Sequence, residues 1–155
     1  MRMPEPGPEH RRLEALAGSW AGEGILHPSP WLPERRTATG RFECRMGVDG
    51  FFLITDYVQE RDGRPIFRGH GVYGFDPDRA RYTMHWFDSM GGGGYREPPL
   101  GVFRGDALRF EVATPQGRAR YTYTIVDRDA FEFRIDGSAD GEVWTPFMEG
   151  RYRRV

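Results

Sequence analysis

The sequence has no lysine, one cysteine, little helical periodicity and no long apolar run. The single Cys44 excludes an internal disulfide framework and a Cys-x-x-Cys metal site. No stretch of about 18 apolar residues is present, and the first residues lack the apolar segment of a signal peptide, so we expect neither a membrane contact nor export and assign the protein to the cytoplasm. Because 23 acidic residues balance 22 basic ones, no overall field attracts nucleic acid or an anionic membrane.

Aromatic residues, glycines and short alternating segments are abundant instead. One helix is predicted after the proline-rich start, with Pro8 in its first turn and Gly18 as its stop. All later segments alternate between apolar and polar residues and are separated by turn sequences such as "DPDR" and "SADG". We predict about ten strands, near 19–27, 37–46, 50–60, 65–75, 80–88, 100–105, 107–114, 117–127, 129–137 and 141–154, and a glycine-rich eleventh candidate at 93–97.

This succession of hairpins favours an all-β fold, a closed antiparallel up-and-down β-barrel with a short N-terminal helix. A two-layer sandwich is the competing architecture. A length of 155 residues fits one domain, residues 1–155, with residues 1–7 as a flexible lead. The alternation places Phe42, Phe110 and Phe133 inside the barrel. Three central segments, "FFLITDYV", "IFRGHGVYGF" and "YTMHWFDSM", are apolar on both faces, which favours a homodimer.

Several motifs carry a resemblance to known families. "GPEHRRLEALAGSWAGEG", "GHGVYGFDPDRARYTMHWFDSMG" and the closing "MEGRYRR" are similar to the bacterial family of unknown function called DUF1579. A helix followed by Gly-x-Trp also resembles the calycin plan of lipocalins and fatty-acid-binding proteins. That resemblance implies that Trp20 plugs the closed end of the barrel after Gly18, with Arg151 or Arg153 over its ring.

The start of the chain also resembles nitrobindin, a haem-binding barrel whose ligand is a histidine in the last strand. In "TPFMEGRYRR", Phe147 or Met148 stands where that histidine would be. Methionine ligates haem iron, usually beside a histidine, so the resemblance disfavours haem. We therefore expect no cofactor and no metal.

Candidate functional residues lie on the central and later strands. His70 and His85 stand on strands that the Asp76–Arg79 turn makes neighbours, and Asp88 follows Trp86 by two residues. The alternative is that both histidines are structural or face outward. The remaining candidate ligand-binding residues are Tyr57, Tyr121, Tyr123 and the loop residue Trp31. Trp31 either covers a ligand or packs on the rim.

An aromatic interior with a few hydroxyl and imidazole groups is typical of a small-molecule pocket. We predict a protein that binds a small apolar or aromatic ligand in the barrel, and not primarily an enzyme. One alternative is a cyclase or isomerase with His85 as the base. Another is a homodimeric interaction module, whose barrel is filled by its own side chains. Residues 89–99, which contain four consecutive glycines, are predicted to form a loop at the open end that gates entry.

Overall fold

The structure is a computed structural model that describes residues 1–91 and 96–155. The first element is a helical segment made of α1 (Pro8–Arg12) and the 3₁₀ turn η1 (Leu13–Leu16). Gly18 follows with a φ of +132°, a conformation that favours glycine, and so ends the helical segment as predicted. Ten strands follow: β1 (Gly18–Leu26), β2 (Arg36–Gly47), β3 (Phe52–Arg61), β4 (Arg64–Asp76), β5 (Arg81–Asp88), β6 (Leu100–Arg104), β7 (Ala107–Thr114), β8 (Gly117–Asp127), β9 (Ala130–Ser138) and β10 (Thr145–Arg154).

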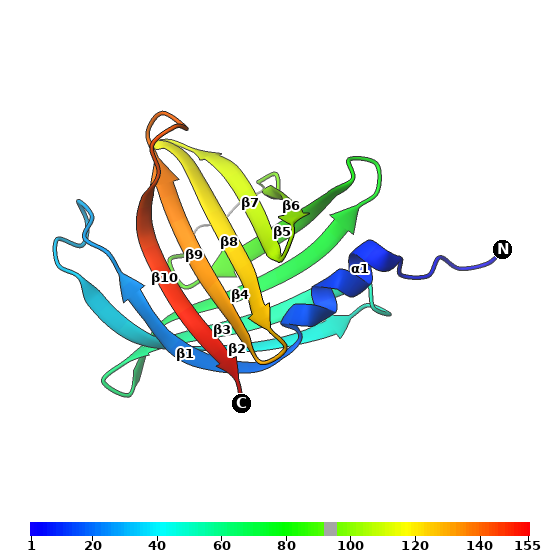
Figure 1. Ribbon diagram of the computed structural model, residues 1–155, viewed down its shortest axis with the longest axis horizontal. Helices are drawn as coiled ribbons and strands as arrows, with labels where there is room; N and C mark the ends of the chain where they lie inside the picture. Colours follow the sequence, from blue (N-terminus) through cyan, green and yellow to red (C-terminus); the bar gives the residue numbers. More distant parts are fainter. Residues whose placement is uncertain (92–95) are drawn as a thin grey trace.

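Each strand pairs with its neighbours in the chain, and β1 pairs antiparallel with β10, which closes the barrel (Figure 1). The predicted closed antiparallel barrel of ten strands with a short N-terminal helix is confirmed. Of the eleventh candidate at 93–97, residues 93–95 lie outside the described residues, and Arg96 and Glu97 belong to no strand. Among the described residues, the pairing of β5 with β6 is short: Tyr82 pairs with Gly101 and Thr83 with Leu100, and the Met84 N–H donates to the Pro99 carbonyl at 3.2 Å.

The helical segment closes one end of the barrel. Leu13 and Leu16 are buried against the core, and the hydroxyl of Tyr82 donates to the Glu9 carbonyl at 2.8 Å. The Arg12 guanidinium lies 4.1 Å from the centre of the Phe103 ring. We call this the closed end. The opposite end, where the connections 27–35, 62–63, 115–116 and 139–144 lie, is the mouth.

Large aromatic side chains fill the closed half of the interior. Phe42, Phe110 and Phe133 are buried, as the alternation predicts. Phe131 packs against Trp20 with ring centres 4.9 Å apart and against Tyr152 at 5.3 Å. The void enclosed between Phe42, Tyr73, Tyr123 and their neighbours is about 10 Å³, which admits about one water molecule. This half of the barrel is therefore a packed core.

Candidate functional site

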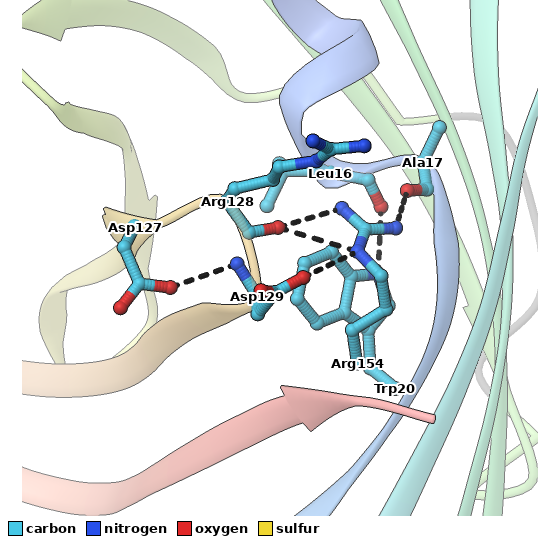
Figure 2. Close-up of polar contacts among 7 residues, drawn as sticks. All are labelled: Leu16, Ala17, Trp20, Asp127, Arg128, Asp129 and Arg154. Carbon is cyan, nitrogen blue, oxygen red and sulfur yellow. Dashed lines mark hydrogen bonds and ion pairs between the residues drawn. The ribbon is translucent and has the colours of Figure 1, made fainter.

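Trp20 belongs to the architecture of the closed end. Its side chain is 1% exposed, and its Nε1 donates to the Leu16 carbonyl at 2.9 Å. The guanidinium of Arg154 lies 4.2 Å from the centre of its ring (Figure 2). The same guanidinium donates to the Ala17 carbonyl at 2.7 Å and to the Arg128 carbonyl at 2.9 and 3.2 Å. One side chain thus joins the helical segment, the β8–β9 turn and the last strand.

The prediction that Arg151 or Arg153 covers Trp20 was wrong. The arginine that covers the ring is Arg154, which lies on the other face of β10. Neither Arg151 nor Arg153 covers the ring, because side chains alternate along β10 and both of these face solvent. Tyr152, between them, faces the core and is fully buried. Arg151 instead lies 3.5 Å from the carboxylate of Glu132 on the outer face. Gly18 leaves room for the contact between Arg154 and Trp20, since a Cβ at Gly18 would lie 2.1 Å from Nη1 of Arg154.

Four of the predicted ligand-binding residues lie on the inner face of the barrel between its middle and the mouth. These are Tyr57, Trp86, Asp88 and Tyr121, which we call the mouth wall. Tyr57 is buried, whereas the other three are partly exposed although they follow the inward alternation of β5 and β8. Burial raises the pKa of the Tyr121 phenol, and the negative charge of Asp88 raises it further. The carboxylate is therefore close enough to the phenol to influence it.

The indole of Trp86 lies flat against the neighbouring strand. A Cβ at Gly69 would lie 2.0 Å from its ring, and one at Gly71 would lie 2.9 Å away, so only glycine allows this position. The indole Nε1 donates to Asp88 Oδ2 at 3.0 Å, and the backbone N–H of Met90 donates to Oδ1 at 2.9 Å. Trp86 and Asp88 are thus fixed relative to each other before any ligand arrives. These two glycines were not predicted as part of the site, although their spacing of two residues on the inward face of β4 was a usable signal.

Free space remains at the mouth beside β9. Gly137 continues the inward alternation after Phe133 and Ile135, and it pairs with Ala119 of β8. A Cβ built on Gly137 meets no atom within 4 Å among the described residues. The inner wall here is lined by small and partly exposed residues, in contrast to the packed closed half. Among the described residues, the interior is therefore packed at the closed end, whereas its wall is partly exposed near the mouth.

Tyr123, a further predicted ligand residue, lies in the packed half. It is 5% exposed, and its hydroxyl shares a hydrogen bond of 2.5 Å with that of Tyr73. Trp31 lies at the mouth on the connection between β1 and β2 and is 76% exposed. It does not pack on the rim, and the structure does not bring it together with the mouth wall.

Both candidate histidines lie on the outer face of the sheet. His70 follows the exposed Arg68 by two residues, and its Nδ1 lies 2.8 Å from Oδ1 of Asp56, with the His70 side chain 45% exposed. His85 is exposed on the neighbouring strand, opposite Val72. The two imidazoles therefore do not join Trp86 and Asp88 inside the barrel. A mechanism that uses His85 as a base on a ligand in the interior has no support from this geometry.

The inner wall also does not fit a haem. Met148 is the residue of the closing strand that faces inward, while Phe147 stands at a bulge and is 41% exposed. His10 packs at the closed end against Phe51, and His27 lies 3.2 Å from Glu149 on the outer face. No histidine is thus in position to ligate an iron in the mouth. Within residues 1–91 and 96–155, no group of three or more His, Cys, Asp or Glu side chains could hold a metal ion.

A solved structure with a TM-score of 0.70 supports the barrel fold. The crystal structure of Rv2717c from M. tuberculosis is similar over 97% of this chain and 99% of its own, with a TM-score of 0.70 and 18% sequence identity. A protein of unknown function from the DUF3598 family of Nostoc punctiforme gives a TM-score of 0.47 at 14% identity, over 99% of this chain and 51% of its own. No curated protein matches the sequence.

None of the described helices is long and apolar enough to span a membrane. The sequence profile of a family described as "Protein of unknown function (DUF1579)" matches residues 5–154. This match extends from before the helical segment to the arginine that covers Trp20. The chain therefore belongs to the DUF1579 family.

Proposed function

We propose that this protein binds a small, largely apolar or aromatic molecule in the mouth half of its barrel. The observation that carries the proposal is the contrast between the two halves of the interior. The closed half is packed, whereas the inner wall near the mouth is partly exposed and leaves free space above Gly137. A site that is mostly apolar with a few fixed polar groups is the usual composition of a small-molecule pocket.

The mouth wall supplies both kinds of group. Trp86 and Tyr121 offer flat aromatic surfaces, and Asp88 is held in place by two hydrogen bonds. An aromatic ligand stacks on such rings with about 0.5–1.5 kcal/mol beyond the burial of its surface. Binding is favoured over catalysis, because the histidines are outside the barrel and no predicted acid or base other than Asp88 stands in the mouth wall.

The test is to fill the free space without disturbing the core. Gly137→Trp places an indole into the mouth at a position whose backbone is extended and whose Cβ has room. The probe is 2-ethylnaphthalene, which is titrated into the protein and followed by its fluorescence. We expect it to bind the wild type, and we expect its affinity for Gly137→Trp to be at least tenfold lower. His85→Trp adds the same side chain to the outer face and serves as the control, with unchanged affinity.

Two results would contradict the proposal. One is equal binding of 2-ethylnaphthalene to the wild type and to Gly137→Trp, because the probe would then sit elsewhere. The other is a wild type that binds no probe and carries no molecule in native mass spectrometry after purification. Either result would leave the filled-barrel interaction module as the better description.

A further inference from the structure

Two buried hydroxyl groups in the middle of the barrel have no well-oriented hydrogen-bond partner among the described residues. They belong to Tyr57, which is 6% exposed, and to Tyr152, which is fully buried. Neither oxygen makes a hydrogen bond of ordinary geometry with a described residue, although the Tyr57 hydroxyl lies near that of Tyr152 and near the Gln59 side chain. Leaving a buried hydroxyl unpaired costs on the order of 1–3 kcal/mol, so this pair needs an explanation.

Two other pairs of polar groups inside the barrel are hydrogen-bonded. The hydroxyls of Tyr73 and Tyr123 bind each other, and Thr55 Oγ1 donates to Cys44 Sγ at 3.4 Å. All four of these residues line the void in the closed half. The unpaired hydroxyls are therefore not a general property of this interior. They are confined to the layer between the packed core and the mouth.

Both hydroxyls point toward the mouth. The backbone of Tyr152 pairs with Gly22, but its hydroxyl oxygen lies 3.5 Å from the Cβ position of Gly24, which is one inward step closer to the mouth. In the same way, Tyr57 pairs with Phe42, but its hydroxyl lies 2.9 Å from the Cβ position of Gly40. The two rings meet over Gly40, because a Cβ there would also lie 3.0 Å from the ring of Tyr152.

We infer that Tyr57 and Tyr152 donate hydrogen bonds to an uncharged oxygen acceptor, such as a ketone or ester carbonyl, at the inner end of the bound molecule. The inference rests on the proposed function and adds the chemical class of the ligand. The aromatic or apolar body of that molecule then lies along Trp86 and Tyr121, and its polar end reaches the two phenols.

The charges around the site favour a neutral acceptor over an anion. Within the described part of the chain, no arginine forms a hydrogen bond with either phenol, and the carboxylate of Asp88 stands in the mouth wall above them. A buried anion without a cationic partner is costly. Burial raises the pKa of Tyr57 and of Tyr152, so both phenols stay protonated and act as donors at neutral pH.

Met148 covers the approach to the two hydroxyls. Its terminal methyl lies 3.4 Å from the Cβ position of Gly24, beside the hydroxyl of Tyr152, and its side chain is 6% exposed. Methionine has three rotatable side-chain bonds and repacks at low cost. Rotation of this side chain is the movement that ligand entry requires. We therefore expect Met148→Ala to speed the association of a ketone probe.

The experiment compares two probes that differ only in the acceptor. 2-Acetylnaphthalene carries a carbonyl, whereas 2-ethylnaphthalene has the same ring and nearly the same shape. We expect Tyr57→Phe/Tyr152→Phe to weaken 2-acetylnaphthalene about tenfold and to leave 2-ethylnaphthalene unchanged, because two hydrogen bonds of ordinary strength are lost. The infrared carbonyl stretch of the bound ketone should lie at lower wavenumber in the wild type than in the double variant.

Tyr73→Phe is the matched control, since it removes a paired hydroxyl from the closed half. It should lower stability and leave the affinity for both probes unchanged, whereas the double variant should be at least as stable as the wild type. If the double variant binds the ketone with wild-type affinity and with the same carbonyl stretch, the inference is wrong. The binding site itself would still stand in that case, provided that Gly137→Trp abolishes binding of both probes.

Discussion

At the scale of the residue, Arg154 joins three segments at the closed end of the barrel. Its guanidinium covers the Trp20 ring and donates to carbonyls of two other segments, while Gly18 leaves room for it. A cation over an indole contributes about 0.5–2 kcal/mol, and each hydrogen bond adds about 0.5–1.5 kcal/mol. These contacts act where the first strand, the last strand and the helical segment meet.

Arg154→Ala should therefore lower the free energy of unfolding by about 2 kcal/mol. Urea unfolding followed by tryptophan fluorescence measures this as a lower midpoint with an unchanged slope. Arg153→Ala is the matched control, because that side chain is exposed, and it should stay within about 0.5 kcal/mol of the wild type. Equal stability of the two variants would show that the covering of Trp20 is not a stabilising contact.

Single residues also show where sequence reasoning succeeded and where it failed. The burial of Trp20 followed from its motif, but its partner depended on which face of the last strand each arginine occupies. The alternation along the last strand indicates the correct face, because the charged Glu149, Arg151 and Arg153 share one face and Tyr152 lies on the other. In the same way, Arg68 stands two residues before His70 and is exposed, which indicates that His70 also lies on the outer face. The unpaired hydroxyls of Tyr57 and Tyr152 carry no sequence signal, since pairing depends on strands far apart in the chain.

At the scale of the element, the helical segment acts as a plug for the closed end. It has only nine residues and a 3₁₀ second half, so it is too short to be stable alone. Its position depends on Leu13, which is fully buried, and on the contacts of Glu9 and Arg12 with β5, β6 and the β6–β7 turn.

Leu13→Ala should lower the free energy of unfolding by about 2–5 kcal/mol, because it opens a cavity beneath the plug. The midpoint of thermal unfolding measures the change. Glu14→Ala removes an exposed side chain from the same turn and should have little effect. If Leu13→Ala left stability unchanged, the plug would not be part of the cooperative core.

The strands themselves were predictable because alternation and turn sequences are local features. The same segments also indicated which residues face inward on β2, β7 and β9, and the burial of Phe42, Phe110 and Phe133 confirms this. The unequal filling of the barrel was not predictable. It depends on how side chains from many strands meet.

At the scale of the whole molecule, the interior is unusual in the number of tyrosines that it holds. Burial raises the pKa of Tyr57, Tyr73, Tyr82, Tyr121, Tyr123 and Tyr152. Below pH 10 these phenols are protonated in the folded and unfolded chains alike, so they add no pH dependence. Above pH 10 the unfolded chain releases their protons first, which stabilises the unfolded state.

The tyrosines should therefore leave the free energy of unfolding unchanged up to about pH 10. They should lower it as the pH rises further. Absorbance near 295 nm, which reports phenolate, should lag behind that of free tyrosine and then rise together with the loss of the folded circular dichroism signal. A smooth titration of all tyrosines near pH 10 with the fold intact would contradict the buried positions of these residues.

The predicted homodimer stays a prediction. Ile54, Val58 and Val72 are partly exposed on the outer face of β3 and β4, and Phe87 of β5 is 61% exposed beside them. These residues lie on the outer face of the three central segments that the sequence shows to be apolar on both faces. Light scattering of the wild type and of Phe87→Asp would measure whether a second copy covers it.

The pairing of β1 with β10 has a consequence for how the chain folds as it is made. Trp20 stands opposite Arg154, so the seam that closes the barrel joins residues separated by nearly the whole length of the sequence. On the ribosome, β1 emerges long before β10 is synthesised. The edge of β1 that pairs with β10 therefore stays unpaired while the eight strands between them are made. Contacts of such long range are slow to form. We therefore expect barrel closure to be a late step of folding and the nascent chain to depend on protection of that first edge.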